Sequence, residues 1–407
     1  MAETLRVVPQ QDPEHEAEND RFSRLRLIPW WDQEKLRTAR ILVIGAGAIG
    51  NELLKNLALL GCANVLIVDL DHIETSNLSR AVLFRAADVG SSKAEAAARG
   101  YRDLLPEATI QPLTANVMQA CGLGLFLWAD IILAGLDNRE ARLWINRAAW
   151  KTNRPWIDGA IEGINGVARV FLPGQPPCYE CTLGATDWAI LDRRMSCNLL
   201  LHQPHPQGRT PTTPTISSII AGIQVQEAVK ALHHLPTLAG KGFVFEGLHH
   251  TSYVTEYTEN PDCMSHDTLD PIVQLPQRSD QLTLSQLLDR GRADLHTDHA
   301  VIEFSRQIIH QLVCPQCAHV EDIFLPVGAI DYQRGHCPHH PPAEQPMRIV
   351  HTLSGYQGQP ALAHRTLDQL GLPPFDIFTV RSIESEISYC LAGDAPAVLG
   401  PLAGDPA

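Results

Sequence analysis

A glycine-rich turn between two apolar runs is the first stretch of this sequence whose residue types point to chemistry. One apolar run leads into Gly45, Gly47 and Gly50, and the next ends at Asp69 and Asp71. The first glycine permits a tight turn, the second lets the backbone approach a phosphate, and the third lets helix and strand pack closely. A helix N-terminus after such a turn offers unpaired N–H groups to that phosphate. The pattern therefore predicts a nucleotide-binding unit.

Polar residues that could bind phosphate or a metal ion follow the apolar runs. Asn77 and Arg80 lie just beyond the acidic pair, and Asp137 follows the run Ile131–Leu133. Open α/β sheets bind ligands at the carboxyl ends of their strands, so a site is expected there. The alternative for Asn77 and Arg80 is a polar surface loop with local turns. Lys93 begins an Ala-rich helix, where the helix dipole disfavours it, so it either extends into solvent or is held by a ligand anion.

Two cysteines and a later Cys–His pair form one candidate metal site. Cys178 and Cys181 have the spacing of a metal knuckle, and Cys263 and His266 repeat that spacing much later. Three thiolates and one imidazole form a closed tetrahedral set for zinc, which indicates a structural role. The first pair alone could instead be redox-active or buried.

A second set of cysteines has the spacing of a zinc ribbon. Its sulfur ligands are Cys314, Cys317 and Cys337, and His340 completes the set. One of three nearby histidines could replace His340: His319, His336 or His339. The alternative is that these cysteines are only buried, but a proline follows the first cysteine of each pair, as in turns.

The remaining cysteines separate into packing residues and one candidate nucleophile. Three lie among apolar residues or in a strand-like stretch and are expected in the core: Cys62, Cys121 and Cys390. Cys197 instead follows Arg193 and Arg194, whose charges favour the thiolate, in a stretch expected to be an irregular loop.

Hydrophobic patterning predicts the elements that position these residues. Strands are expected at Ile41–Ile44, Val65–Val68, Thr109–Val117, Ile131–Leu133 and Pro155–Ala160, and helices at Arg139–Lys151 and Thr215–His234. The alternation predicts an α/β fold, a doubly wound, mainly parallel Rossmann-like sheet, with Gly166–Phe171 as an antiparallel addition.

The sequence beyond about residue 270 changes character and indicates a small C-terminal α+β domain that contains the zinc ribbon. Its expected elements are a helix at Leu284–Arg290, strands at Val301–Phe304, Met347–His351 and Glu386–Tyr389, and a helix at Thr366–Gly371. We expect a flexible tail at 1–20, the nucleotide-binding domain at 21–270 with a crossover loop at 184–214, the C-terminal domain at 271–391, and a flexible tail at 392–407.

Composition excludes several classes of function. The chain has 407 residues, 44% of them hydrophobic, and a formal net charge of −14. This charge argues against nonspecific binding of nucleic acid or of an anionic membrane. No apolar run is long enough for a membrane span and the N-terminus is not a signal peptide, so a cytoplasmic location is expected. Ten cysteines in such a chain favour metal and catalytic uses over disulfides.

The chain resembles the ThiF/MoeB/HesA/ubiquitin-activating-enzyme superfamily across roughly residues 20–270, and in particular the stand-alone bacterial-type members. The stretches that carry the resemblance, in order, are Arg21–Arg24, the glycine turn, Asp69–Asp71, Ser76–Arg80, Lys93, Leu136–Asn138, Cys178–Cys181, the helix that begins with Pro211–Ser218, and Asn260–Cys263. A hydride-transferring dehydrogenase is not expected to carry this combination.

The resemblance implies an adenylation domain that binds ATP and Mg²⁺ and activates the C-terminal glycine of a ubiquitin-like protein. It assigns ribose binding to Asp69 with Asp71 beside it, phosphate binding to Asn77, Arg80 and Lys93, and magnesium binding to Asp137. It also implies a homodimer in which Arg24, with help from Arg21, reaches into the partner's site.

The resemblance also implies a second step after adenylation. In members that go beyond adenylation, a cysteine of the crossover loop accepts the acyl group as a thioester, and Cys197 lies in that segment. The expected partner is then a ubiquitin-conjugating-like enzyme. The alternative is a MoeB/ThiF-type sulfur-carrier adenylyltransferase of cofactor biosynthesis, although the C-terminal extension lacks the loop of a sulfurtransferase domain.

Overall fold

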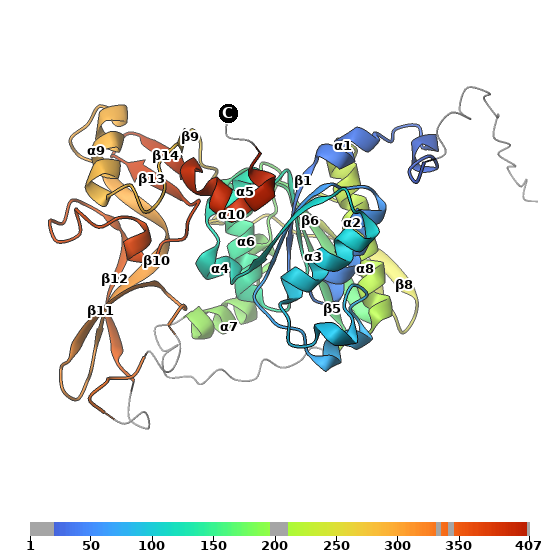
Figure 1. The fold of residues 1–407 in the computed structure, drawn as a ribbon, viewed down its shortest axis with the longest axis horizontal. Helices are drawn as coiled ribbons and strands as arrows, with labels where there is room; N and C mark the ends of the chain where they lie inside the picture. Colours follow the sequence, from blue (N-terminus) through green and yellow to red (C-terminus); the bar gives the residue numbers. More distant parts are fainter. Residues whose placement is uncertain (1–19, 196–210, 331–334, 341–345, 405–407) are drawn as a thin grey trace, which may run out of the picture.

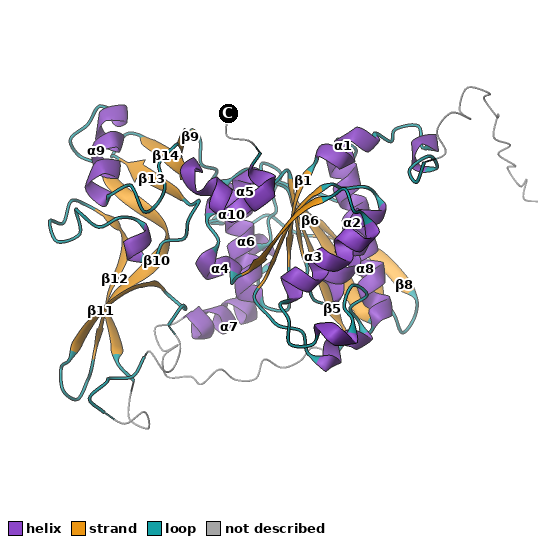
Figure 2. Cartoon of the chain, in the orientation of Figure 1, coloured by secondary structure: helices purple, strands orange, loops and turns teal. Residues whose placement is uncertain are grey.

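The computed structural model describes residues 20–195, 211–330, 335–340 and 346–404, and it contains two β-sheets that lie side by side with helices between them (Figures 1 and 2). The N-terminal tail expected at 1–20 lies outside the described residues except for its last residue. Among the described residues, no helix combines the length and the apolar character that crossing a membrane requires.

The larger sheet has eight strands in the order β3-β2-β1-β4-β5-β6-β7-β8. The first five are mutually parallel and the last three are antiparallel. The strands are β1 (Arg40–Ile44), β2 (Asn64–Asp69), β3 (Thr109–Thr114), β4 (Ile131–Ala134), β5 (Trp156–Glu162), β6 (Asn165–Phe171), β7 (Lys241–Glu246) and β8 (Thr251–Glu256). Because the strand order reverses at β1, the crevice between the carboxyl ends of β1 and β4 is the expected ligand site of such a sheet.

Helices cover both faces of this sheet, which confirms the doubly wound, mainly parallel prediction. One face carries α2 (Ala48–Leu59), α3 (Lys93–Leu104) and α8 (Pro214–Leu232), with α1 (Gln33–Thr38) leading into β1. The other face carries α4 (Val117–Ala120), α5 (Leu123–Trp128) and α6 (Arg139–Lys151). Strands β1 and β4 are almost wholly apolar because both of their faces are buried.

The second sheet has the order β11-β10-β13-β14-β9, and β12 also pairs with β10. Its strands are β9 (Ile272–Leu275), β10 (Val301–Val313), β11 (Val320–Pro326), β12 (Arg348–Tyr356), β13 (Ile377–Arg381) and β14 (Glu386–Leu391). Helix α9 (Leu284–Leu295) packs on it and shares its apolar core. This sheet confirms the predicted α+β character of the C-terminal region.

Two buried charged residues join the second sheet to the helices of the first. The guanidinium of Arg306 donates to the carbonyl oxygens of Met118 at 3.0 Å and Cys121 at 2.9 Å. The carboxylate of Asp376 accepts from the backbone N–H of Leu123 at 2.7 Å and lies 3.6 Å from Arg306. The contact satisfies backbone groups at the ends of short helices, so the two sheets are held by directional bonds as well as by apolar packing.

Several predicted boundaries were wrong for local reasons. The strand expected over Thr109–Val117 ends at Thr114 because α4 begins at Val117. Most of the first half of the crossover loop expected at 184–214 is a helix, α7 (Ala185–Met195). The helix expected at Thr366–Gly371 is only a 3-10 turn over Asp368–Leu370.

The prediction of a flexible tail at 392–407 is wrong for Ala392–Ala403. These residues form two 3-10 turns around the helix α10 (Ala395–Leu399). Val398 and Leu399 are buried in the core between the first sheet and α5. The alanines, glycines and prolines of this stretch suggested a tail, but its few large apolar side chains are enough to dock it.

The three cysteines expected to pack in the core do so. Cys62, Cys121 and Cys390 are buried, and burial raises the pKa of each thiol to about 12. Such thiols are poor nucleophiles at neutral pH because the thiolate is scarce.

The docking of α10 gives a prediction on stability. Replacement of Leu399 by Ala should lower the free energy of unfolding by about 2–5 kcal/mol, because it leaves a cavity in a closed core. Leu27→Ala is the matched control, since Leu27 is 69% exposed and should change stability by less than about 0.5 kcal/mol. Chemical denaturation measures both, and equal effects would contradict the docking of this segment.

Candidate nucleotide site and metal centres

The glycine turn has the conformation that its pattern predicts, and the surroundings differ at each of its three glycines. Gly45 has a φ of +91° and donates its N–H to the carbonyl of Val68 at 2.8 Å. A Cβ at Gly45 would lie 2.6 Å from the carbonyl oxygen of Gly135, and one at Gly50 would lie 1.9 Å from that of Gly45. A Cβ at Gly47 would meet no atom of the described residues within 4 Å. The turn is therefore closely packed on its inner side and open where a ligand would approach.

Asp69 holds this turn in addition to facing the predicted site. Its carboxylate accepts from the N–H of Ala46 at 2.7 Å and from that of Asp71 at 2.8 Å. Burial raises the pKa of Asp69, and these hydrogen bonds only partly offset that effect. A carboxylate has about four acceptor positions, so about two remain for hydroxyl groups of a ligand.

Asn51 is a structural residue of the site that the sequence analysis missed. It is fully buried on α2. Its side-chain amide donates to the carbonyl of Ala46 at 2.7 Å and its oxygen accepts from the N–H of Leu83 at 2.9 Å. It therefore links the glycine turn to the segment before α3. A polar residue on the apolar face of a helix was the signal that could have found it.

Lys93 was expected either to extend into solvent or to be held by a ligand anion, but in the structure its partner is another side chain of the protein. Its Nζ lies 2.7 Å from a carboxylate oxygen of Asp71, and its N–H donates to the carbonyl of the same residue at 2.9 Å. The Lys93 side chain is 13% exposed and the Asp71 side chain is 55% exposed. The ion pair offsets the unfavourable position of a lysine at a helix N-terminus.

The other predicted phosphate-binding residues form hydrogen bonds within their own turn. The oxygen of Asn77 accepts from the N–H of Glu74 at 2.9 Å, and Arg80 donates to the carbonyl of Ser76 at 2.7 Å. These bonds match the local-turn alternative. They also keep both side chains beside the segment that follows Asp71.

Arg24 and Asp137 are both exposed and make no hydrogen bond or ion pair with the described part of the chain. Arg21 is different, because its guanidinium donates to the carbonyl of Leu104 at 2.9 Å and so anchors the N-terminal segment to the end of α3. The two arginines therefore have separate roles in this structure.

A buried cluster of charges lies beneath the Asp137 loop and was not foreseen. Asp158 is fully buried and accepts from Arg142 at 2.8 Å and from Arg169 at 2.9 Å. Burial alone would raise the pKa of Asp158, but the two guanidinium groups outweigh it and hold the pKa below its ordinary value. Arg142 also donates to the carbonyl of Leu136, directly before Asp137. An acid within an otherwise apolar strand was the only signal in the sequence.

The ends of the crossover segment are tied to the neighbouring elements. Arg139 in the first turn of α6 pairs with Asp187 in the first turn of α7 at 3.0 Å. Where the chain returns, the carbonyl of Pro211 accepts from the N–H of Gly163 at 2.7 Å. Cys197 itself lies outside the described residues.

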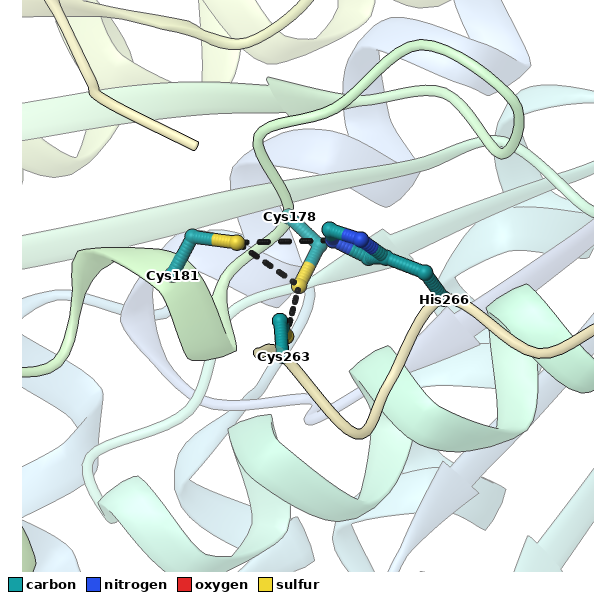
Figure 3. Close-up of side chains that lie close together, drawn as sticks. All are labelled: Cys178, Cys181, Cys263 and His266. Atoms are coloured by element: carbon teal, nitrogen blue, oxygen red, sulfur yellow. Dashed lines mark hydrogen bonds between the residues drawn. The ribbon is translucent and has the colours of Figure 1, made fainter. Parts of the chain in front are cut away.

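The first predicted metal set is assembled as expected (Figure 3). The ligand atoms of Cys178, Cys181, Cys263 and His266 all lie within 4.8 Å of one another. The sulfur of Cys178 is 3.8 Å from that of Cys181 and 3.5 Å from that of Cys263. Thiolates on one tetrahedral zinc ion lie about 3.8 Å apart, so these residues fit zinc.

Helix α6 supplies the groups around this metal set. The side-chain amide of Asn146 donates to the sulfur of Cys178 at 3.3 Å. The ring of Trp150 lies on that of His266, with centroids 4.5 Å apart. Such contacts orient metal ligands before and after the ion binds.

The second metal set is also assembled, at the far end of the β10–β12 arm of the second sheet (Figure 1). The ligand atoms of Cys314, Cys317, Cys337 and His340 lie within 4.8 Å of one another. The sulfurs of Cys317 and Cys337 are 3.7 Å apart, a separation that fits zinc. His339 approaches Cys317 at 3.8 Å, but His340 is the histidine grouped with all three sulfurs.

With this geometry established, comparison with known proteins decides the family. The model of the ThiF family matches residues 20–265. The chain belongs to the ThiF family. The match covers the whole eight-stranded sheet and ends before β9, so the second sheet lies outside it.

Curated relatives of this ThiF-family chain include activating enzymes. It is 43% identical over 157 residues to the NEDD8-activating enzyme E1 catalytic subunit of Arabidopsis thaliana, covering 35% of this chain and 34% of that protein. It is 41% identical over 157 residues to the SUMO-activating enzyme subunit uba-2 of Caenorhabditis elegans, covering 38% and 27%. The chain thus spans about a third of the length of the curated relatives it matches.

Among solved structures, the ThiF-family chain is similar to E. coli MccB in its crystal structure with ATP. The TM-score is 0.51 with 24% sequence identity, covering 61% of this chain and 75% of that one. At this identity the likeness concerns the fold, and it agrees with the predicted Rossmann-like sheet.

The metal sets give a prediction on composition. The purified protein should hold two zinc ions, and Cys263→Ser should hold one and unfold at a lower temperature, because the zinc joins two distant segments. Elemental analysis and thermal unfolding measure the two effects. Cys121→Ala is the control, since it removes a buried thiol and should keep both ions. An unchanged zinc content in Cys263→Ser would contradict the assignment.

Proposed function

We propose that this ThiF-family protein uses ATP to adenylate the C-terminal glycine carboxylate of a ubiquitin-like protein. The observation that carries the proposal is the glycine turn after β1, which is open at Gly47 and bound by the carboxylate of Asp69, with Lys93 paired to Asp71 two residues further on. The similarity to NEDD8- and SUMO-activating enzyme subunits supports a protein substrate of this class.

The residues suit attack of a carboxylate on the α-phosphorus of ATP. A bond forms between the carboxylate oxygen and phosphorus, and the bond to the β-phosphate oxygen breaks, so that pyrophosphate leaves with the electron pair. Negative charge accumulates between two anions, and Lys93 and Arg80 would neutralise it. The free acceptor positions of Asp69 suit the ribose hydroxyls, with Asp71 beside it, and Asn77 would join Lys93 and Arg80 at the phosphates. No covalent bond to the protein is needed in this step.

Asp137 is the residue that would hold magnesium. Its carboxylate is exposed and makes no bond within the described residues, and carboxylate oxygens are typical Mg²⁺ ligands. When bound, the ion would supply further charge neutralisation at the phosphates.

We also propose a homodimer in which Arg24 completes the partner's site. The Arg24 side chain has no hydrogen bond or ion pair with the described part of its own chain, while Arg21 fixes the segment that carries it. An exposed arginine on an anchored segment suits a charge supplied to a second copy.

The second proposed step is transfer of the acyl group to Cys197. Its thiolate would attack the acyl carbon, the bond to the AMP oxygen would break, and AMP would leave. The pair Arg139–Asp187 supports this step, because it ties the start of the crossover segment to the helix that follows Asp137. The thioester would then pass to a conjugating enzyme in the cytoplasm.

The adenylation step is tested with Arg80→Ala. ATP–pyrophosphate exchange should fall about 100-fold, because a charge aimed at the phosphates is lost. Stability should change by less than about 0.5 kcal/mol, because the Arg80 side chain forms a local hydrogen bond and no long-range bond among the described residues. Arg85→Ala is the matched control, since Arg85 is likewise an arginine bonded to local carbonyls. Exchange near the wild-type rate in Arg80→Ala would reject the proposed role.

The transfer step is tested with Cys197→Ala. The variant should keep ATP–pyrophosphate exchange and lose the enzyme–modifier adduct that thiols cleave, as seen by mass spectrometry with and without reductant. Cys62→Ala serves as control and should keep the adduct. An adduct that persists in Cys197→Ala would exclude this cysteine. Exchange without any adduct in the wild type would favour the sulfur-carrier alternative.

A further inference from the structure

The end of strand β4 is held from both faces of the sheet by buried polar side chains. Gln224 of α8 reaches it from one face, and Arg142 of α6 reaches it from the other. Neither contact is part of the strand ladder. Burying an amide and a guanidinium is costly unless their polar atoms form hydrogen bonds.

Gln224 is fully buried and bonds to two adjacent strands. Its Nε2 donates to the carbonyl of Ala134 at 2.9 Å and to that of Ile157 at 3.1 Å. Its Oε1 accepts no hydrogen bond among the described residues. A Cβ at Gly159 would lie 2.2 Å from that oxygen, so the glycine is what allows the amide to enter.

Arg142 makes the corresponding contacts on the other face. Its guanidinium donates to the carbonyls of Leu136 and Gly159, the latter at 3.2 Å, and pairs with the buried Asp158 at 2.8 Å. Two carbonyls that flank Gly135 in sequence, those of Ala134 and Leu136, are therefore held from opposite sides.

This segment also touches the glycine turn. The N–H of Gly135 donates to the carbonyl of Ile44 at 3.0 Å, and its own carbonyl packs against Gly45. Asp137 comes two residues later and has no side-chain partner in the described structure. The backbone therefore fixes the position of its Cα and the direction of its Cα–Cβ bond, and no described side chain holds its carboxylate.

We infer that Arg142 and Gln224 are positioning residues for adenylation, which fix the backbone of Asp137 relative to the glycine turn. The inference rests on the proposed function. It predicts that loosening either contact leaves the glycine turn intact but misplaces the carboxylate proposed to hold magnesium. A displacement of about 1 Å at such a group can lower a rate substantially.

Arg169 provides a matched control. It is also paired with Asp158, at 2.9 Å, and its guanidinium lies over the ring of Tyr179, 5.0 Å from the centroid. Its side chain does not bond to the β4 segment within the described residues. Arg142→Lys and Arg169→Lys therefore each weaken one arginine contact of Asp158, but only Arg142→Lys also loses the contact with the β4 segment. A lysine keeps the charge but cannot reproduce the fork of contacts.

The first experiment compares these two variants in the full-length protein. Hydrogen exchange of the segment 134–138 should accelerate in Arg142→Lys and stay near wild type in Arg169→Lys. The Mg²⁺ concentration that gives half-maximal ATP–pyrophosphate exchange should rise about tenfold in Arg142→Lys only. High Mg²⁺ should restore part of the lost rate. Equal behaviour of the two variants would overturn the inference.

Gln224→Met keeps the inference testable if Arg142→Lys folds poorly. Methionine has a similar volume, removes the donors to Ala134, and removes the unpaired oxygen as well. It should reproduce the faster hydrogen exchange and the shifted Mg²⁺ dependence, and an unshifted dependence would overturn the inference. Wild-type protein that neither binds ATP nor exchanges pyrophosphate would reject the proposed function itself, whereas active wild type with unshifted variants rejects only the positioning roles.

Discussion

Helix α6 contacts three parts of the molecule with side chains from its successive turns, and this packing sets how those parts lie relative to one another. Arg142 holds strands β4 and β5, while Trp144 lies beneath the guanidinium of Arg306 from the second sheet at 4.7 Å. Asn146 and Trp150 then contact the first metal set. One helix thus fixes the spacing between the candidate nucleotide site, the metal centre and the C-terminal domain. A change in its register would disturb all three.

Two buried carboxylates, Asp158 and Asp376, align backbone groups, and both have a positively charged partner. Asp158 has two arginines, and Asp376 has Arg306 together with the N–H of Leu123. A buried ion pair is a weak source of stability, because desolvation offsets much of the attraction. Its hydrogen bonds are directional, however, and in both places the pair also binds backbone carbonyl or N–H groups at the end of a strand or helix. Orientation is therefore the clearer physical consequence of these pairs.

The second sheet lies beyond the ThiF family match but packs against the first. The ThiF family match ends at residue 265, and β9 of the second sheet begins at Ile272. The second sheet nevertheless shares its core with the first through Ile377, Cys390 and the returning α10. The region beyond the family match is thus an integral part of the packed structure and carries its own metal set at the end of an arm.

The parallel sheet, the glycine turn and both metal sets could be predicted from the amino-acid sequence. The sheet and the turn depend on local periodicity or spacing, as in Gly45–Gly50. The first metal set joins distant segments, and it could be predicted because each segment carries two ligands at the same short spacing. Three features became visible only in the folded structure. They are the partner of Lys93, the docking of α10, and the contacts of Gln224 and Arg142 at the end of β4. Those contacts join residues far apart in sequence, such as Gln224 and Ala134, and a single buried polar residue carries no spacing that names its partner. The glycine turn could be predicted because its geometry is local, whereas the backbone that leads to Asp137 is bound by side chains of α6 and α8 from opposite faces of one sheet.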